Sequence, residues 1–227
     1  MRAWSESVRE ALLDALALVL PVECAGCGAD GRELCPACRR RLAPAPVLTV
    51  TPGGLPVHAG ARYREHVQRV VLACKDGRTA LADPLAALLL AALAVADPGV
   101  GVELCVVPST RAAFRRRGFD PVRFVLARTG RRDARVLRPA RAHRVQKALG
   151  RAERRANLRG VHRARSRLDG RRFLLVDDVV TTGATLEEAA RAIREAGGEV
   201  LGAVVIAATP LRSARAATHT RRSEKTG

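Results

Sequence analysis

Aromatic side chains are scarce in this chain. Phenylalanine, tryptophan and tyrosine make up 3% of the 227 residues, although 48% of the residues are hydrophobic. A hydrophobic core must therefore be built from Ala, Leu and Val rather than from rings. Residues 111–172, the arginine-rich middle of the chain, contain only Phe114, Phe119 and Phe124 as aromatics. This is few for a nucleic-acid module that stacks bases on aromatic side chains.

Long apolar runs are also missing. The most apolar stretches, residues 15–22 and 85–96, are shorter than the roughly 18 residues that a membrane-spanning helix needs. The first stretch does not fit a signal peptide either, because Glu6, Glu10 and Asp14 interrupt the required order of a basic and then an apolar segment. We therefore expect a cytoplasmic protein with no membrane span, in which residues 1–20 form an amphipathic helix.

Lysine is nearly absent, so the positive charge rests on arginine. The chain has 40 Lys and Arg residues against 22 Asp and Glu, a net charge of +18, yet lysine occurs only at Lys75, Lys147 and Lys225. Two interpretations stay open. The field of such a protein attracts polyanions such as nucleic acid or pyrophosphate, or the charge reflects a compositional preference for Arg wherever a surface cation is tolerated.

Two common nucleotide-binding motifs are absent, and a different motif is present. The chain has no G-x-x-x-x-G-K-[ST] and no G-x-G-x-x-G after a strand. Residues 173–185 read F-L-L-V-D-D-V-V-T-T-G-A-T. The apolar run 173–176 predicts a strand buried in a parallel sheet, with Asp177 and Asp178 at its carboxyl end. Open α/β sheets bind ligands at that end, where paired acids accept hydrogen bonds from sugar hydroxyls or hold hydrated Mg²⁺.

Small and hydroxyl-bearing residues follow the two acids: Thr181, Thr182, Gly183, Ala184 and Thr185. They lead into residues 186–196, where apolar side chains recur at helical spacing. A loop that opens a helix exposes unpaired N–H groups, which suit a phosphate. Acids at one end and a phosphate loop at the other predict a ribose 5-phosphate site. Alternatively, Thr185 and Glu188 form only a capping box, which would leave the acid pair and Gly183 unexplained.

This motif resembles the phosphoribosyl pyrophosphate (PRPP) signature of type I phosphoribosyltransferases. In that signature two adjacent acids contact the ribose hydroxyls and the following loop holds the 5-phosphate. The resemblance implies that Asp177 and Asp178 are the catalytic acids and that residues 181–185 bind the phosphate.

Four cysteines near the amino end form two C-x-x-C pairs. Cys24 and Cys27 precede Cys35 and Cys38, with seven residues between the pairs. Such pairs predict a structural Zn²⁺ held by four thiolates, and disulfides are the competing interpretation. The remaining cysteines, Cys74 and Cys105, stand alone in apolar surroundings and are expected to be buried small hydrophobic residues.

The order of segments predicts the domain organisation. Residues 21–44 form the four-cysteine module, the Pro-, Thr- and Gly-rich residues 45–56 a linker, and residues 57–208 an α/β domain with a mostly parallel sheet flanked by helices. Residues 57–63 are expected to be an edge strand, and the polar, basic residues 209–227 a disordered tail. Residues 111–120 are expected to form an arginine-rich loop that holds pyrophosphate, or else a solvated basic helix.

The order of motifs along the chain looks like that of the ComF/GntX family of phosphoribosyltransferase-like proteins. The shared pattern includes L-A-C-K-D-G, V-V-P-x-x-R, R-R-G-F and Q-x-x-L-x-R-x-E-R-x-x-N-L-x-G, besides the cysteines and the PRPP motif. The resemblance implies a type I phosphoribosyltransferase fold with an amino-terminal zinc module, and it places further substrate-binding residues at Lys75, Arg111, Arg117, Gly118, Gln146, Arg154 and Asn157. The chain departs from the family at Asp120-Pro121, where Asn-Gln is common, and at His143, where Thr is common.

Two functions of different class follow from this pattern. In the first, the protein is an enzyme that uses Mg²⁺ and PRPP, transfers phosphoribosyl to an unidentified nitrogenous acceptor and releases pyrophosphate, with residues 138–160 as a hood over the substrate. In the second, suggested by the family's association with competence, the fold is a non-catalytic accessory for DNA uptake or single-stranded DNA handling. The sequence does not identify the acceptor or the oligomeric state.

Overall fold

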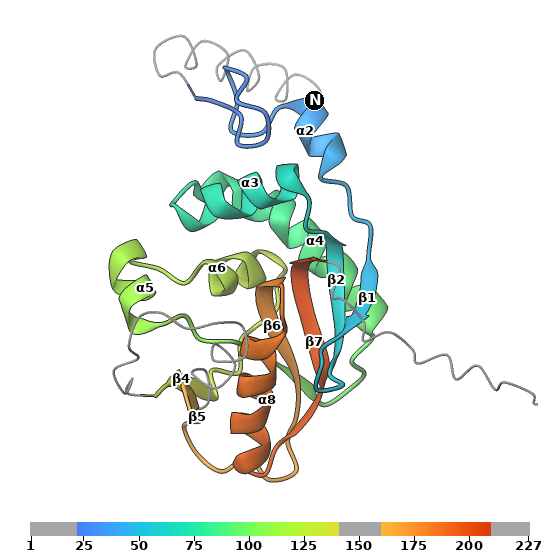
Figure 1. The fold of residues 1–227 in the computed structure, drawn as a ribbon, viewed down its shortest axis with the longest axis vertical. Helices are drawn as coiled ribbons and strands as arrows, with labels where there is room; N and C mark the ends of the chain where they lie inside the picture. The colour runs from blue at the N-terminus through green and yellow to red at the C-terminus, as the bar shows by residue number, and fades with distance from the viewer. Residues whose placement is uncertain (1–21, 141–159, 210–227) are drawn as a thin grey trace, which may run out of the picture.

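A computed structural model of the chain describes residues 22–140 and 160–209, as shown in Figure 1. The predicted amino-terminal helix 1–20, most of the hood 138–160 and nearly all of the tail 209–227 lie outside the described residues. Gln146, Arg154, Asn157 and His143 lie outside them as well.

A five-stranded sheet forms the centre of the main domain, in the order β1-β2-β7-β6-β3. Its members are β1 (Val47–Val50), β2 (Pro56–Arg62), β3 (Val102–Val106), β6 (Arg172–Val180) and β7 (Glu199–Ala208). The pairs β2·β7, β7·β6 and β6·β3 are parallel, and β1 pairs antiparallel with β2. The prediction of a mostly parallel sheet is therefore confirmed.

The edge of this sheet differs from the prediction. Residues 57–63 were expected to form an edge strand after a linker, but β2 lies between β7 and β1. The edge strand next to β2 is β1, inside the segment 45–56 that composition marked as a linker, and β3 forms the other edge. The Thr-Pro-Gly-Gly sequence at 51–54 is a turn between two strands, and the turn residues gave this segment the composition of a linker.

Helices cover both faces of the sheet (Figure 1). One face packs against α3 (Glu65–Lys75), the short 3₁₀ turn η1 (Thr79–Leu81), α4 (Ala82–Ala96) and α6 (Pro121–Arg128). The other face packs against α8 (Ala184–Glu195) and the two-stranded antiparallel ribbon of β4 (Leu137–Pro139) and β5 (His162–Ala164). Each crossover thus returns over a face of the sheet, as parallel strands require.

One helical stretch among the described residues meets the length and composition of a membrane span. It runs from Thr79 to Ala96, with a mean hydropathy of 2.0, and includes η1 and α4. In the structure this stretch is a core helix: Leu85, Leu88 and Leu89 are buried, and α4 packs against β2 and β7.

The four-cysteine module lies against α3. It contains a bridge between Glu23 and Asp30 and the short helix α2 (Pro36–Arg41). His66 and Arg69 of α3 bond to backbone carbonyls of the module at 3.0 and 3.2 Å. Arg78, three residues after α3, pairs with Glu33 at 2.5 Å and donates to the carbonyl of Glu23. The module is thereby fixed to the helix that leads to the candidate site.

The arginine-rich segment after β3 is a helix rather than a loop. Residues 111–117 form α5 (Arg111–Arg117), with Thr110 as N-cap accepting from the N–H of Ala113 at 3.2 Å. The expectation of a loop was therefore wrong, because the cap at Thr110 and the good helix propensity of Ala and Arg outweigh the repulsion among the guanidinium groups. None of the residues of α5 is buried, which agrees with the solvated-helix alternative.

Candidate functional site

The paired acids lie near the carboxyl end of β6, as predicted. The N–H of Asp178 donates to Asp177 Oδ1 at 2.8 Å, which fixes the first carboxylate against the backbone of the second. Burial, followed by the negative charge of Asp178, raises the pKa of Asp177 from 3.8 to about 8. The charge of Asp120 raises this pKa further, whereas the N–H of Asp178 and the charge of Lys75 lower it. In the ligand-free protein Asp177 therefore keeps its proton to a higher pH than an ordinary aspartate does.

Asp178 makes an ion pair with a lysine from another part of the fold. Lys75, the last residue of α3, places its Nζ 2.6 Å from Asp178 Oδ2, and each side chain is about one-fifth exposed, at 21% and 20%. Tyr63 lies close to both charges: burial raises the pKa of its hydroxyl, the charge of Lys75 lowers it and that of Asp178 raises it. The pairing brings together two of the predicted site residues that are 103 positions apart in the sequence.

The predicted phosphate loop follows the acids and opens α8. Gly183 is the N-cap of α8 with φ of +78°, a left-handed conformation that favours glycine. Within residues 22–140 and 160–209, the backbone N–H groups of Thr181, Thr182 and Gly183 donate to no other group, and the N–H of Ala184 bonds only to Thr182 Oγ1 at 3.4 Å. These donors remain available for an anion at the positive end of the helix dipole.

The turn between β1 and β2 supports this loop, which the sequence did not indicate. Thr51 is buried, and a methyl group added at Gly183 would lie 2.6 Å from its Cγ2. The N–H of Gly53 donates to Glu187 Oε1 in the first turn of α8, at 2.6 Å. Glycine is therefore required at 183 for two reasons, its backbone conformation and the closeness of Thr51.

The capping-box alternative is not what the structure shows. The cap of α8 is Gly183, without a side-chain hydrogen bond, and Thr185 is exposed. Glu188 is buried, accepts from the N–H groups of Gly160 and His162 at 2.7 and 3.3 Å, and pairs with Arg191 at 2.7 Å. The carboxylate thus ties the start of β5 to α8 instead of closing a cap.

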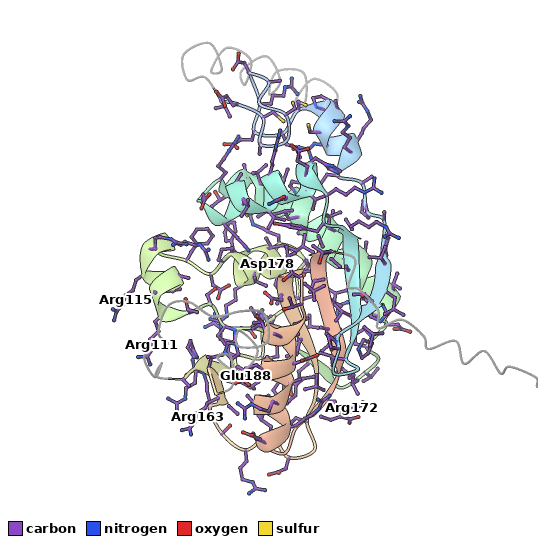
Figure 2. The ribbon with its side chains drawn as sticks, viewed as in Figure 1. Arg111, Arg115, Arg163, Arg172, Asp178 and Glu188 are labelled. Carbon is purple, nitrogen blue, oxygen red and sulfur yellow. The ribbon has the colours of Figure 1, made fainter. Side chains whose placement is uncertain are left out.

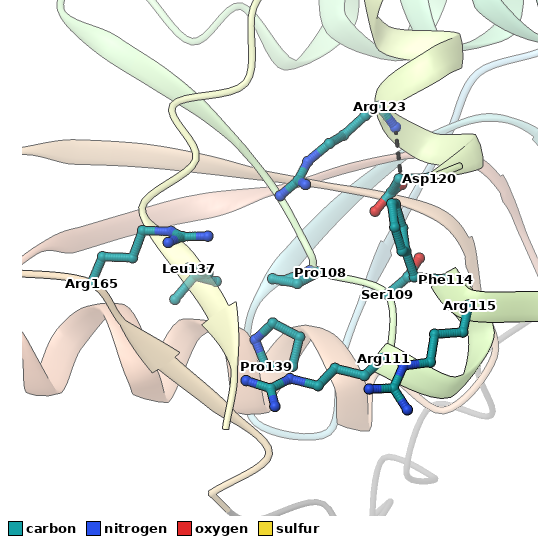
Figure 3. A pocket seen from close by; sticks show the side chains of 10 residues that line it. All are labelled: Pro108, Ser109, Arg111, Phe114, Arg115, Asp120, Arg123, Leu137, Pro139 and Arg165. Atoms are coloured by element: carbon teal, nitrogen blue, oxygen red, sulfur yellow. Dashed lines mark hydrogen bonds between the residues drawn. The ribbon is translucent and has the colours of Figure 1, made fainter. Parts of the chain in front are cut away.

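A cavity of about 210 Å³ lies between α5 and the β4·β5 ribbon (Figure 3). Arg111, one of the predicted substrate-binding residues, is part of its lining. Arg117 and Gly118 lie at the end of α5, where the N–H of Gly118 bonds to the carbonyl of Phe114 at 2.8 Å. Among the described residues, no hydrogen bond or ion pair joins Arg117 or Gly118 to the acid pair, and Arg117 Nε is buried without a partner.

The positive charge around these elements is concentrated in arginine. Figure 2 shows Arg111 and Arg115 on α5 and Arg163 on β5 on the side of the molecule that carries α5 and the ribbon, with Asp178 and Glu188 nearer the middle. Three arginines thus lie on one side of Asp178 in this view, and guanidinium groups suit phosphate oxygens.

The four cysteines are positioned so that they could hold a metal ion. The four Sγ atoms of this cluster all lie within 4.8 Å of one another: those of Cys24, Cys27, Cys35 and Cys38. The Sγ atoms of Cys27 and Cys35 are 3.8 Å apart. Four sulfurs around one Zn²⁺ at about 2.3 Å lie roughly 3.8 Å from each other, so the spacing fits a tetrahedral ion. None of the six cysteines of the described residues is in a disulfide, and the disulfide alternative has no support.

Backbone groups turn toward these sulfurs. The N–H of Cys35 donates to Cys24 Sγ at 3.3 Å and that of Cys38 to Cys35 Sγ at 3.5 Å. Burial raises the pKa of Cys24, but hydrogen bonds from backbone N–H groups outweigh burial and lower this pKa to about 6. Burial and the neighbouring thiols raise the pKa of Cys38 to about 12. Four adjacent sulfurs do not ionise together unless a cation compensates their charge, which is what a metal ion supplies.

The remaining two cysteines lie where the sequence predicted. Cys74 and Cys105 are buried in the two hydrophobic clusters on opposite faces of the sheet. Burial raises the pKa of both thiols, in the case of Cys105 to about 12. These two thiols therefore stay neutral and act as small apolar side chains.

Comparison with known proteins agrees with this geometry. Residues 61–225, more than half of the chain, match the family described as phosphoribosyl transferase domain. Orotate phosphoribosyltransferase of Methanopyrus kandleri is 62% identical over 37 residues, and adenine phosphoribosyltransferase of Rhodococcus jostii is 51% identical over 39 residues. These matches cover 16% and 17% of this chain and 20% and 22% of the relatives, so the chain spans about a fifth of the length of each relative.

Proposed function

This chain belongs to the phosphoribosyl transferase domain family, and we propose that it binds PRPP with Mg²⁺ and transfers the phosphoribosyl group to a nitrogenous acceptor. The observation that carries the proposal is that one short segment brings two carboxylates close to backbone N–H groups that can bind an anion. Asp177 and Asp178 are separated by two residues from backbone N–H groups that donate to nothing else in the described chain. A ribose 5-phosphate has hydroxyls for the acids and a phosphoryl group for the loop.

In the proposed reaction, a nitrogen of the acceptor forms a bond to the anomeric carbon while the bond from that carbon to pyrophosphate breaks. The carboxylates orient the ribose and stabilise the positive charge that develops on its ring. Bound Mg²⁺ would neutralise part of the charge of the pyrophosphate oxygens. Lys75, in contact with Asp178, would hold that acid in position, and Arg111, which lines the cavity at α5, would bind substrate.

Calorimetry with PRPP and Mg²⁺ tests the proposal directly. The wild-type protein should bind, and the double variant Asp177→Asn, Asp178→Asn should lose most of its affinity. Asp76→Asn, which changes an exposed acid just after α3, is the matched control and should bind normally. Equal PRPP binding by the double variant and the control would contradict the proposed site. Exchange of labelled pyrophosphate into PRPP then distinguishes turnover from binding alone.

The family resemblance to ComF/GntX proteins supports a second candidate, an accessory role in DNA uptake or single-stranded DNA handling. The observation in its favour is the net charge of +18. Salt-dependent capture of single-stranded DNA that survives the double Asn substitution would support this role. Capture that is lost together with PRPP binding would instead assign the charge to the substrate site.

We also propose that the metal of the four-cysteine site is Zn²⁺, since four thiolates at tetrahedral spacing suit that ion. The test is the metal content of the purified protein, measured by plasma emission spectrometry. One equivalent of zinc is expected in the wild-type chain and none in Cys35→Ser, whereas a Cys74→Ser control should retain it.

A further inference from the structure

The cavity between α5 and the ribbon has an apolar wall. Pro108, Phe114, Leu137 and Pro139 form this wall (Figure 3). Phe114 is 48% exposed, whereas Phe173 is fully buried and Phe119 and Phe124 pack edge to face at 6.0 Å. In a chain with 3% aromatics, an exposed phenyl ring beside two proline rings indicates a surface for a flat, apolar ligand.

Cations surround this wall. Arg111, Arg115, Arg123 and Arg165 also line the cavity, and Figure 3 shows Arg123 and Arg165 extending inward from opposite sides. Arg123 is neutralised by Asp133, whose Oδ2 lies 2.7 Å from its Nε. The guanidinium groups of the other three make no hydrogen bond or ion pair within the part of the chain that the structure describes. Their charge is available to a ligand that carries an acidic group.

One acid also lines the cavity. Asp120 is 8% exposed and is the N-cap of α6, with its Oδ1 accepting from the N–H groups of Val122 and Arg123 at 3.1 and 3.2 Å. Its Oδ2 accepts no hydrogen bond from the described residues, so this oxygen can accept one from a ligand N–H. The N–H of Val107 bonds to the carbonyl of Val176 at 2.9 Å, so Pro108 of the cavity and Asp177 of the acid pair each directly follow a residue of this contact, which places the cavity beside the candidate ribose site.

From these contacts we propose that the cavity binds the acceptor, and that the acceptor is a flat nitrogen heterocycle bearing a carboxylate. This inference rests on the proposed phosphoribosyl transfer and names the substrate class for it. The ring lies on Phe114 and the prolines, the carboxylate pairs with Arg165, and a ring N–H donates to Asp120. Pyrophosphate fits less well, because it has no apolar surface for the wall and no N–H for Asp120, whose charge repels it.

The test uses three rings of nearly equal size, with binding measured by ligand-observed NMR in the presence and absence of PRPP and Mg²⁺. Pyrrole-2-carboxylate has both the charge and the N–H, furan-2-carboxylate lacks the N–H, and pyrrole-2-carboxamide lacks the charge. We expect the first to bind, and each of the others to bind about tenfold more weakly. A carboxamide that binds as well as the carboxylate would overturn the proposal, as would a failure of all three rings to bind.

Two variants and a control assign the contacts. Arg165→Gln should weaken pyrrole-2-carboxylate about tenfold but leave the carboxamide unchanged. Asp120→Asn, which keeps a capping side chain, should remove the preference for pyrrole over furan. Arg163→Gln, an exposed residue of β5 outside the lining, should change nothing. If Arg165→Gln instead weakens pyrophosphate more than the pyrrole, the cavity belongs to the leaving group and the proposal is wrong.

The failure of this inference and that of the proposed function are separable on the same preparation. PRPP that binds while no ring does refutes the acceptor assignment and leaves the phosphoribosyl site intact. Rings that bind with the expected preferences while PRPP does not bind support the cavity chemistry and refute the proposed transfer.

Discussion

Replacing Asp177 with asparagine is expected to stabilise the ligand-free protein while it weakens PRPP binding. The pKa of Asp177 is raised from 3.8 to about 8, chiefly by burial and then by the charge of Asp178. Between these two pH values the folded chain binds more protons than the unfolded chain, so this group lowers stability progressively as pH rises. Asparagine carries no charge, and its side-chain oxygen can still accept the N–H of Asp178, so the variant avoids this loss.

The size of the effect follows from the pH range. Each pH unit inside the window changes the free energy of unfolding by ~1.4 kcal/mol, so about two units, from pH 6 to pH 8, set an upper bound of about 3 kcal/mol. Asp177 keeps some exposure to solvent, and solvent screening reduces this bound to an expected ~1–2 kcal/mol. For a chain of this length, the advantage of the variant in melting temperature should grow by about 3–6 °C over that range.

The assay is thermal unfolding without ligand at several pH values for the wild type, Asp177→Asn and the control Asp76→Asn. The melting temperature of Asp177→Asn should exceed that of the wild type by an amount that increases with pH and levels off above about pH 8. The control should follow the wild type. A difference that is constant or that shrinks with rising pH would refute the reasoning, because it would mean that Asp177 is ionised in the folded protein at every pH tested.

Three further outcomes are expected. Lys75→Met leaves Asp178 without its cation and should weaken PRPP binding, measured by calorimetry, about tenfold or more, whereas Lys75→Arg should retain most of the affinity. A Lys75→Met variant that binds PRPP as tightly as the wild type would exclude a role for the pair. Gly183→Ala should lower the free energy of unfolding, measured with urea, by about 1–2 kcal/mol because of the left-handed backbone alone. The contact of the new methyl group with Thr51 should lower it further, and adding Thr51→Ser, which removes the Thr51 methyl group, should recover part of that further loss. Chelation of the cysteine-bound metal should lower the melting temperature of the wild type, and no such shift is expected in Cys35→Ser, which cannot complete the site.

The local features of this fold could be predicted from the sequence because each depends on neighbouring residues. The apolar run before Asp177, the small residues of the loop and the C-x-x-C pairs indicate β6, the start of α8 and the metal site without knowledge of the rest. Segments dominated by turn residues or by charge were predicted less well. The strand β1 was taken for a linker, and the helix α5 for a loop, because composition there reflects turns and solvent exposure rather than secondary structure.

Contacts between distant segments had no signal in the sequence. Thr51 beside Gly183, Gly53 bonded to Glu187, and Asp120 near Asp177 are set by the order of strands in the sheet, which a single sequence does not specify. The cavity lined by Phe114 and Arg165 likewise joins α5 to the residue after β5. Pattern reasoning can assign chemistry to a segment, but the partners of that segment come from the topology.

The helix α3 shows how the topology joins two features that the sequence presents as separate. Its side chains His66 and Arg69 bond to the four-cysteine module, and its last residue, Lys75, pairs with Asp178 at 2.6 Å. An α-helix of 11 residues is a rigid spacer of about 16 Å. Ordering of the module by the proposed metal would therefore fix the position of the helix, and the helix in turn would fix the lysine beside the acids. The metal site and the PRPP site are thus expected to lose their order together when the metal is removed, although no metal ligand touches the substrate pocket.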